Sequence, residues 1–395
     1  MLNNPFSPWP SYTPAEIEKV AEVLASNRVN YWTGEEGRLF EREFATYIHS
    51  QHAVAVANGT IALLCAWKAL ELGPGDEVIV PARTYVVSAS SVVLTGATPV
   101  FADVDLDSQN ITVESIARMI TPRTKAICCV HLAGWSCDMD ALNDLASSHG
   151  IPLVEDCAQA HGATWQGKPV GGLADIAAWS FCQDKIITTG GEGGMVTTQD
   201  EKYREAIWSY KDHGKSWSSV YDKKSPSGFS LMHDTIGING RLPEMQSAIG
   251  RIQLGMMPEW IRARRANGHR ILDTAATLSA LRVAYPPSTV GHAWYRAYVF
   301  VRSEALKIGW TRDRIIKAMN VNGVPCSQGS CSEVYLEKCF TSAGISPGTR
   351  LPAAQELGET SLMFLVHPTL TEDEISKTCD TLVKVVQQAT LENAA

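Results

Sequence analysis

The feature that most constrains this chain is an alternation of short apolar runs with helical patterns along residues 52–210. The apolar runs are typical of strands buried on both faces, and the segments between them carry the periodicity of helices. This alternation predicts an α/β fold with a doubly wound, mostly parallel sheet covered by helices, whose ligands bind beyond the carboxyl ends of the strands. We expect strands at 52–57, 77–80, 99–101, 126–131, 151–155 and 176–181, and helices at 61–72, 86–95, 113–120 and 139–149.

The pattern changes after residue 212. Residues 212–240 are polar, rich in Ser and Lys and without periodicity, which is typical of a functional or interface loop. We therefore expect residues 1–240 to form an N-terminal segment with a large domain, and residues 241–395 to form a long helix with a smaller C-terminal α/β domain. Within the second part, the expected elements are helices at 243–278, 312–319 and 372–390 and strands at 296–301 and 363–366.

Composition excludes several classes of protein. A net charge of −8 and a pI near 5.7 argue against a nucleic-acid or anionic-membrane binder. No apolar run approaches the roughly 18 residues of a membrane span, and the N-terminus does not resemble a signal peptide. The ten cysteines form no CxxC pair, so we expect no metal site and instead buried thiols in a reducing cytoplasm.

The turn Asn58-Gly59-Thr60 lies between a predicted strand and a predicted helix. It would present backbone N–H groups and a hydroxyl at the N-terminus of that helix, which is a natural seat for a phosphate. The same three residues are also an ordinary helix-capping turn, and alone they do not decide between the two.

Asp156 ends the predicted strand in Leu153-Val154-Glu155-Asp156. A carboxylate at a buried strand end needs a partner, and the positive nitrogen of a pyridinium ring would keep it ionised. The alternative is an aspartate that caps the next turn. For the nearby Glu155 and His161 we favour structural roles.

Lys185 follows a nearly continuous apolar run at 176–182 and precedes a glycine-rich turn, after which Met195-Val196 begins a second short strand. A nucleotide-binding P-loop is excluded because its lysine follows the glycines, and no G-x-G-x-x-G opens a helix. A desolvated lysine with a lowered pKa suits Schiff-base chemistry with an aldehyde. This lysine, an acidic strand end and a phosphate seat together indicate a pyridoxal phosphate enzyme.

These residues belong to a longer series of motifs that resembles the DegT/StrS family of pyridoxal-phosphate-dependent nucleotide-sugar aminotransferases. The resemblance implies the fold of aspartate aminotransferase, fold type I, and it spans nearly the whole chain. The matching segments, in family order, are NGTIAL (58–63), GPGDEVIVPARTYVVSAS (73–90), GATPVFADVD (96–105), ITPRTKAI (120–127), VHLAGWSCDMDAL (130–142), VEDCAQAHGA (154–163), SF…K (180–185), GEGGMV (191–196) and IGINGRLPEMQSAIGRIQL (236–254).

The resemblance assigns two catalytic residues. Lys185 would form the Schiff base with the cofactor and then carry the proton between the carbon atoms of cofactor and substrate. Asp156 would hold the pyridine nitrogen protonated, so that the ring withdraws electrons.

It also assigns the residues that bind the cofactor. Gln159 would contact the ring hydroxyl and Tyr85 would stack on the ring face. Gly59, Thr60 and Ser180 would hold the phosphate.

Asn239, by the same resemblance, would reach the phosphate bound in the other subunit. This implies a homodimer with shared active sites.

The sequence departs from the family pattern in two places. The Gly190-Gly191 pair adds one glycine between the lysine and the GEGG turn, and we expect this residue to loop out. A His-Tyr-Pro-like segment of the family is replaced at 326–334 by CSQGSCSEV, in a region that borders the substrate. Relatives that dehydrate sugars carry histidine at the lysine position, so Lys185 argues against that activity.

The sequence thus predicts an aminotransferase that transfers an amino group from an amino acid, with glutamate favoured, to a nucleotide-linked keto-sugar. The alternatives are an aminotransferase for a cyclitol or another keto substrate, a sugar dehydratase, and a pyridoxal-binding regulator without turnover.

Overall fold

A computed structural model describes residues 5–221 and 232–391 of the chain. Its centre is a seven-stranded sheet in the order β1-β9-β8-β5-β4-β2-β3. The predicted strands are all present, and β9 is the short strand expected after the glycine-rich turn. The strands are β1 (His52–Val56), β2 (Glu77–Pro81), β3 (Thr98–Ala102), β4 (Thr124–Val130), β5 (Leu153–Asp156), β8 (Ile176–Ser180) and β9 (Gly194–Thr198).

The large sheet is mostly parallel, as predicted. The pairs β2–β3, β2–β4, β4–β5 and β5–β8 are parallel, whereas β9 runs antiparallel to both β8 and β1. A parallel neighbour needs a long crossover connection, usually a helix. The glycine-rich segment between β8 and β9 is a turn, so β9 folds back beside β8.

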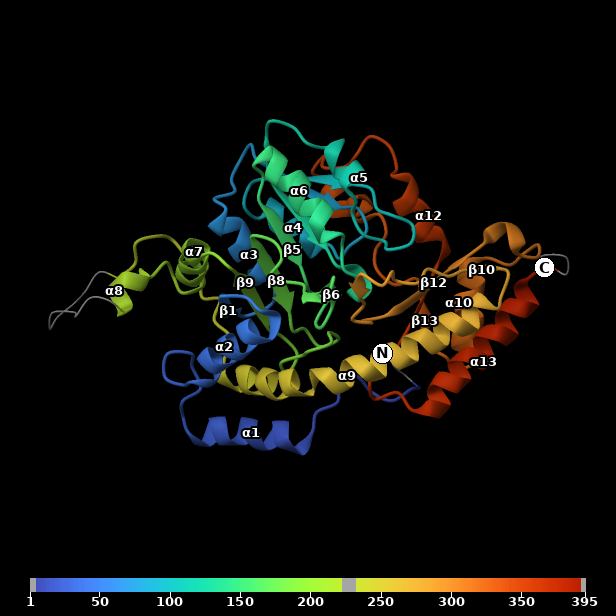
Figure 1. Cartoon of the computed structure of the whole chain (residues 1–395), viewed down its shortest axis with the longest axis horizontal. Helices are drawn as coiled ribbons and strands as arrows, with labels where there is room; N and C mark the ends of the chain where they lie inside the picture. The colour runs from blue at the N-terminus through green and yellow to red at the C-terminus, as the bar shows by residue number, and fades with distance from the viewer. Residues whose placement is uncertain (1–4, 222–231, 392–395) are drawn as a thin grey trace.

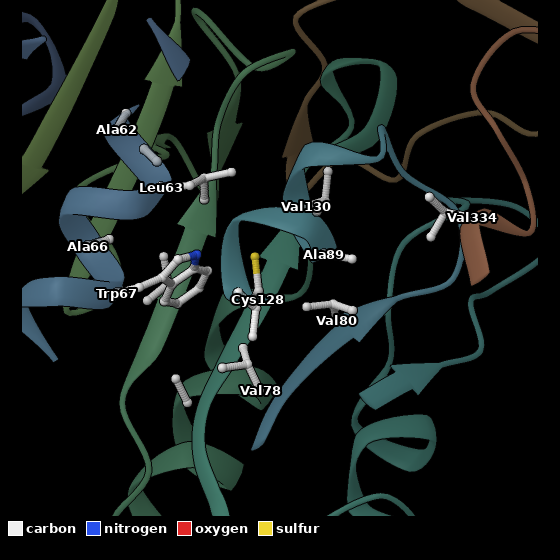
Figure 2. Close-up of a cluster of buried hydrophobic side chains, with 14 of the residues drawn as sticks. Ala62, Leu63, Ala66, Trp67, Val78, Val80, Ala89, Cys128, Val130 and Val334 are labelled. Carbon is white, nitrogen blue, oxygen red and sulfur yellow. The ribbon is translucent and has the colours of Figure 1, made fainter. Parts of the chain in front are cut away.

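Helices cover this sheet. One hydrophobic core lies between the sheet and α3 (Gly59–Ala69). Figure 2 shows Leu63 and Trp67 of α3 facing Val78, Cys128 and Val130 of the sheet. Trp67 is fully buried and donates its indole N–H to Ser91 Oγ at 2.8 Å, so the ring is accommodated without an unpaired polar group. The other helices of this region are α4 (Val87–Val93), α5 (Val113–Ala117), α6 (Met139–His149) and α7 (Glu201–Lys211), with the 3₁₀ turn η1 (Leu132–Gly134).

The long helix α9 (Glu244–Ala276) begins close to the predicted start at residue 243. Figure 1 shows it passing below the large sheet and continuing toward α13. Two N-terminal helices that the sequence analysis did not predict, α1 (Pro14–Ala25) and α2 (Glu36–Ile48), pack against it. Gln253 of α9 donates to Glu16 of α1 at 2.7 Å, which fixes this contact in a buried environment.

The C-terminal part contains a four-stranded antiparallel sheet in the order β10-β12-β14-β13. The predicted strands and helices occur close to their expected positions. The strands are β10 (Leu281–Arg282), β12 (Ala297–Val301), β13 (Cys326–Ser327) and β14 (Ser361–Phe364). The helices are α10 (Arg312–Val321), α11 (Lys338–Thr341), α12 (Pro352–Thr360) and α13 (Glu372–Ala389), with 3₁₀ turns η2 (Ser303–Ala305) and η3 (Val334–Leu336).

A third, three-stranded sheet joins the two parts, because β11 (Val290–Gly291) pairs with β6 (Thr164–Trp165), which pairs with β7 (Lys168–Pro169). Within the stretch predicted to be an irregular loop, α8 (Trp217–Tyr221) forms a short helix, and residues 222–231 of that stretch lie outside the described residues.

The cysteines are free thiols and most of them are buried, as expected, with Cys331 and Cys339 exposed. Among the described helices, none combines the length and apolar character that crossing a membrane requires.

Candidate active site

A cavity of about 580 Å³ lies at the carboxyl ends of the parallel strands. This is the edge at which the fold predicts ligand binding. Seven of the eight residues assigned by resemblance line this cavity, namely Gly59, Thr60, Tyr85, Asp156, Gln159, Ser180 and Lys185. The eighth, Asn239, does not line it.

Asp156 is the last residue of β5 and is buried in the wall of the cavity. Ser88 Oγ donates to its Oδ2 at 2.8 Å, and the Ala158 N–H donates to its Oδ1 at 3.1 Å. Burial raises the pKa of Asp156, and the hydrogen bonds from Ser88 and Ala158 oppose this only in part. A cationic partner in the cavity would stabilise the ionised form of this buried carboxyl group.

The N-terminus of α3 forms one end of the cavity. Asn58 caps this helix, and its side chain accepts a hydrogen bond from the Ile61 N–H at 3.0 Å. The turn at residues 58–60 is therefore a helix cap whose N–H groups also face the cavity. The helix dipole and the first N–H groups at this end attract an anion. A Cβ atom on Gly59 would lie 2.7 Å from Cβ of Ser180, so only glycine allows this close approach of α3 to β8.

Gln159 and Tyr85 differ in how firmly they are held. The Ala133 N–H donates to Gln159 Oε1 at 2.7 Å, which orients the amide and directs its NH₂ group away from that contact. Tyr85 is 66% exposed, so its ring is available to a planar ligand.

Lys185 lies in the same cavity beside a carboxylate and an aromatic ring. Its Nζ is 3.7 Å from Asp184 Oδ1 and 5.1 Å from the centre of the Tyr295 ring. Burial lowers the pKa of Lys185, but Tyr295 and Asp184 together outweigh burial and raise the pKa. The prediction of a lowered pKa is therefore wrong for these surroundings, because the chain itself supplies the ammonium group with a counter-charge.

The extra glycine after Lys185 is accommodated in the turn. Gly190 and Gly191 have φ values of +78° and +119°, which favour glycine at both positions. The turn closes where Thr189 Oγ1 donates to the Glu192 carbonyl at 2.8 Å. The insertion thus lies in the turn, while Lys185 remains in the cavity wall.

Asn239 is exposed and pairs with Asp212 in an isolated antiparallel bridge. Its position just before α9 places it outside the cavity of its own chain. The predicted contact with another subunit stays a prediction.

Glu155 has the structural surroundings that we favoured, whereas both ring nitrogens of His161 are buried without a hydrogen-bond partner among the described residues. Glu155 accepts backbone N–H groups of Gly171 and Leu173 at 2.8 and 3.0 Å, and His131 at 2.9 Å. His161 packs against Trp179, and burial lowers its pKa to about 3, so the imidazole is neutral.

Several cavity residues were not identified from the sequence. Asp184 immediately precedes Lys185 and could have been found by its position alone. Tyr295 donates to Asp184, and Arg296 lies 3.7 Å from the same carboxylate, but both come from the segment just before β12, more than a hundred residues later. The segment that departs from the family pattern contributes Ser327, Gly329, Ser330 and Cys331 to the wall.

The fold and the site define the class of protein. A mostly parallel sheet with a lysine, a buried aspartate and a helix N-terminus around one cavity is the arrangement of pyridoxal-phosphate-dependent enzymes of fold type I. The chain belongs to the DegT/DnrJ/EryC1/StrS aminotransferase family, whose model matches residues 10–383. The protein is therefore a pyridoxal-phosphate-dependent aminotransferase.

Comparisons with individual proteins agree with this family. The aminotransferase from Psychrobacter cryohalolentis is 54% identical, with a TM-score of 0.95 over 97% of this chain and 99% of that one. UDP-N-acetyl-3-dehydro-alpha-D-glucosamine 3-aminotransferase of Acidithiobacillus ferrooxidans is 34% identical over 87% of each chain. The PLP-form of Spr1654 from Streptococcus pneumoniae is 27% identical, with a TM-score of 0.87 over 98% of this chain and 99% of that one.

The residues present fit this cofactor. Asp156 is a buried carboxyl group whose ionised form a protonated ring nitrogen would stabilise. The N-terminus of α3 lines the cavity beside Ser180, where a phosphate can reach its N–H groups. Lys185 would provide the amine with which the aldehyde reacts.

Proposed function

We propose that this aminotransferase transfers an amino group from glutamate to a keto-sugar linked to a nucleoside diphosphate. The observation that carries the proposal is the convergence of Lys185, Asp156 and the capped N-terminus of α3 on one cavity. The relative from Acidithiobacillus ferrooxidans is named for such a substrate. The cavity also has polar walls at Ser327 and Ser330, which suit the hydroxyl groups of a sugar.

Each residue has a defined part in the proposed reaction. Pyridoxal phosphate, when bound, supplies an electron sink for the carbon that carries the amino group. Asp156 holds the positive charge of the ring nitrogen, and the N–H groups of α3 with Ser180 bind the phosphate. Lys185 Nζ would carry a proton between the substrate carbon that bears the nitrogen and the neighbouring carbon of the cofactor. Asp184 and Tyr295 hold this amine in place between transfers.

We further propose that the active form is a homodimer in which Asn239 contacts the phosphate in the partner subunit. Its exposed position before α9 and its absence from the lining of the cavity of its own chain support this. The isologous contact of a two-fold dimer would build two equivalent sites.

We place the protein in the cytoplasm. Its ten free thiols, with Cys331 and Cys339 exposed, support a reducing compartment.

The decisive experiment is a turnover screen of nucleotide-linked keto-sugars with glutamate, read by mass spectrometry. A mass change that replaces the keto oxygen with an amine supports the proposal. Amination of cyclitol ketones alone, loss of water, or cofactor binding without any turnover would each favour one of the alternatives.

Cofactor attachment is tested separately. Wild-type protein should be yellow, absorb at shorter wavelength after glutamate is added, and retain the cofactor covalently after borohydride reduction. Lys185→Ala should lose the covalent link. Wild-type protein that shows no such absorbance with pyridoxal phosphate would contradict the assignment of Lys185.

A further inference from the structure

Arg83 follows β2 and is a buried cation without a counter-ion. Its side chain is 1% exposed. Nε donates to Gln109 Oε1 at 2.9 Å and Nη2 donates to Ser361 Oγ at 3.1 Å, both neutral partners. Nη1 is buried and has no hydrogen-bond partner. Within residues 5–221 and 232–391, no carboxylate forms an ion pair with Arg83.

This situation is costly for a guanidinium group. A buried cation normally has a paired anion, because desolvation is otherwise uncompensated. Lys211 is equally buried, and it follows the rule: its Nζ lies 3.1 Å from Glu41 Oε1. The face of the Tyr298 ring, 5.5 Å from the guanidinium carbon of Arg83, offers only a weak substitute.

Arg83 also lines a second cavity, of about 630 Å³, which shares Ser330 and Cys331 with the cofactor cavity. A ligand held near Lys185 can therefore extend past these two residues toward Arg83. Arg312 lines the second cavity as well and adds positive charge.

The remaining charges of the second cavity are largely balanced among themselves. Arg312 pairs with the exposed Asp313 at 2.7 Å. Arg350 pairs with Glu333 and lies 3.6 Å from Glu359. Glu337 is exposed to solvent. Arg83 thus stands out as a buried lining charge that lacks an opposite charge.

We propose that Arg83 and Arg312 bind a carboxylate of the substrate, so that the second cavity is a specificity subsite of the aminotransferase. Two of the three nitrogens of Arg83 are already engaged, and Arg312 is shared with Asp313, so the subsite suits a single negative charge better than a diphosphate. The inference rests on the proposed function, which supplies two sources of a carboxylate. One is a keto-sugar oxidised at C6, and the other is the side chain of the glutamate donor.

The test separates these sources because the two half-reactions can be measured one at a time. In the sugar arm, the enzyme in its amino form meets a nucleotide-linked keto-hexose or the matching keto-hexuronate, which differ only at C6. In the donor arm, the cofactor-loaded enzyme meets glutamate or norvaline without keto-sugar, and the change in visible absorbance is followed in a single turnover.

Arg83→Met removes the charge and keeps most of the side-chain volume, whereas Arg83→Lys keeps the charge. Arg314→Met is the control for the substitution itself, since Arg314 is exposed and lines neither cavity. We expect Arg83→Met to lower kcat/KM for one carboxylated substrate by about 10- to 100-fold, as for loss of a charge-assisted hydrogen bond. The kcat/KM of Arg83→Met for the uncharged analogue of that substrate should change by less than about threefold. Arg83→Lys should recover part of the loss.

The arm in which this selective loss occurs identifies the source of the carboxylate. Equal kinetics of Arg83→Met and wild type on all four substrates would overturn the inference, and so would a uniform loss, which marks a structural strut between Gln109 and Ser361. Thermal melts of each variant establish that it is folded. If wild type aminates neither sugar, the proposed function fails while the donor arm still decides the role of Arg83.

Discussion

Gly59 at the start of α3 and Ser180 at the end of β8 are in such close contact that a Cβ atom on the glycine would lie 2.7 Å from Cβ of the serine. Real Cβ atoms do not approach one another this closely, so the helix or the strand would have to move. Both residues belong to the predicted phosphate seat. The contact therefore couples the identity of one glycine to the shape of the cofactor cavity.

The first prediction follows from this contact. Gly59→Ala should lower the affinity for pyridoxal phosphate by roughly 10- to 100-fold, because overpacking by one methyl group typically costs about 1–3 kcal/mol. Equilibrium titration of the cofactor, followed by absorbance, measures the effect. Gly73→Ala is the control, since nothing lies within 4 Å of a Cβ atom there. Equal affinities for the two variants would show that the seat tolerates the methyl group.

The second prediction concerns Asp156, whose Oδ2 accepts from Ser88 at 2.8 Å. Asp156→Asn keeps the shape of the side chain but removes the charge that stabilises a protonated ring nitrogen. Turnover should fall on the order of 10³-fold or more, as for other preorganised electrostatic partners. Steady-state kinetics with saturating cofactor, alongside a thermal melt, measures this. Near-normal turnover would leave Asp156 as a turn cap.

Much of the fold could be predicted from the sequence, because buried parallel strands are written as continuous apolar runs separated by amphipathic helices. The helix α9 was recognised by its length and periodicity. The N-terminal helices α1 and α2 were not, although Thr13 and Glu16 form a capping box at the start of α1. That signal is local and short, whereas the pattern that indicates the large sheet begins at residue 52 and repeats over many elements.

The site was predictable where the chain brings residues together through the sheet. Asp156 and Ser180 end two adjacent parallel strands, so their sequence positions alone place them on one edge. Tyr295 and Arg296 reach the cavity from the C-terminal part, and nothing in their local sequence indicates this. The pKa of Lys185 was wrongly predicted for the same reason, since one of the groups that raise it, Tyr295, is distant in sequence.

The third prediction concerns stability at low pH. His292 Nδ1 accepts the Trp294 N–H at 2.7 Å, and burial lowers the pKa of His292 to about 3, with a smaller contribution from His269. The unfolded chain therefore binds this proton first, near pH 6.5, and the folded protein only near pH 3. The contribution of neutral His292 to the free energy of unfolding is therefore fully present above about pH 6.5. It is lost as the pH falls toward 3, by up to about 1.4 kcal/mol per pH unit.

His292→Asn should make this loss shallower, since asparagine does not bind the proton and its oxygen can still accept from Trp294. Urea unfolding at a series of pH values from 7 to 4 measures the slope. His149→Asn, at an exposed position, controls for the substitution itself. An unchanged slope in His292→Asn would mean that other groups dominate the acid limb.

The last prediction concerns assembly. Asn239 is exposed, precedes α9 and does not line the cavity of its own chain. If it contacts the phosphate in the partner subunit, Asn239→Asp should inactivate the enzyme, because a carboxylate of nearly the same shape would repel the phosphate. Lys185→Ala should be inactive for a different reason, since it removes the amine.

Mixing the two inactive variants separates the possible arrangements. With shared sites, each mixed dimer has one site that carries both changes and one that carries neither. Random exchange of subunits at equal amounts should then restore about a quarter of wild-type activity, since half of the dimers are mixed and half of their sites are intact. Native mass spectrometry verifies that mixed dimers form. Mixed dimers without recovered activity would place Asn239 in its own chain's site, and full activity of Asn239→Asp alone would place it outside any site.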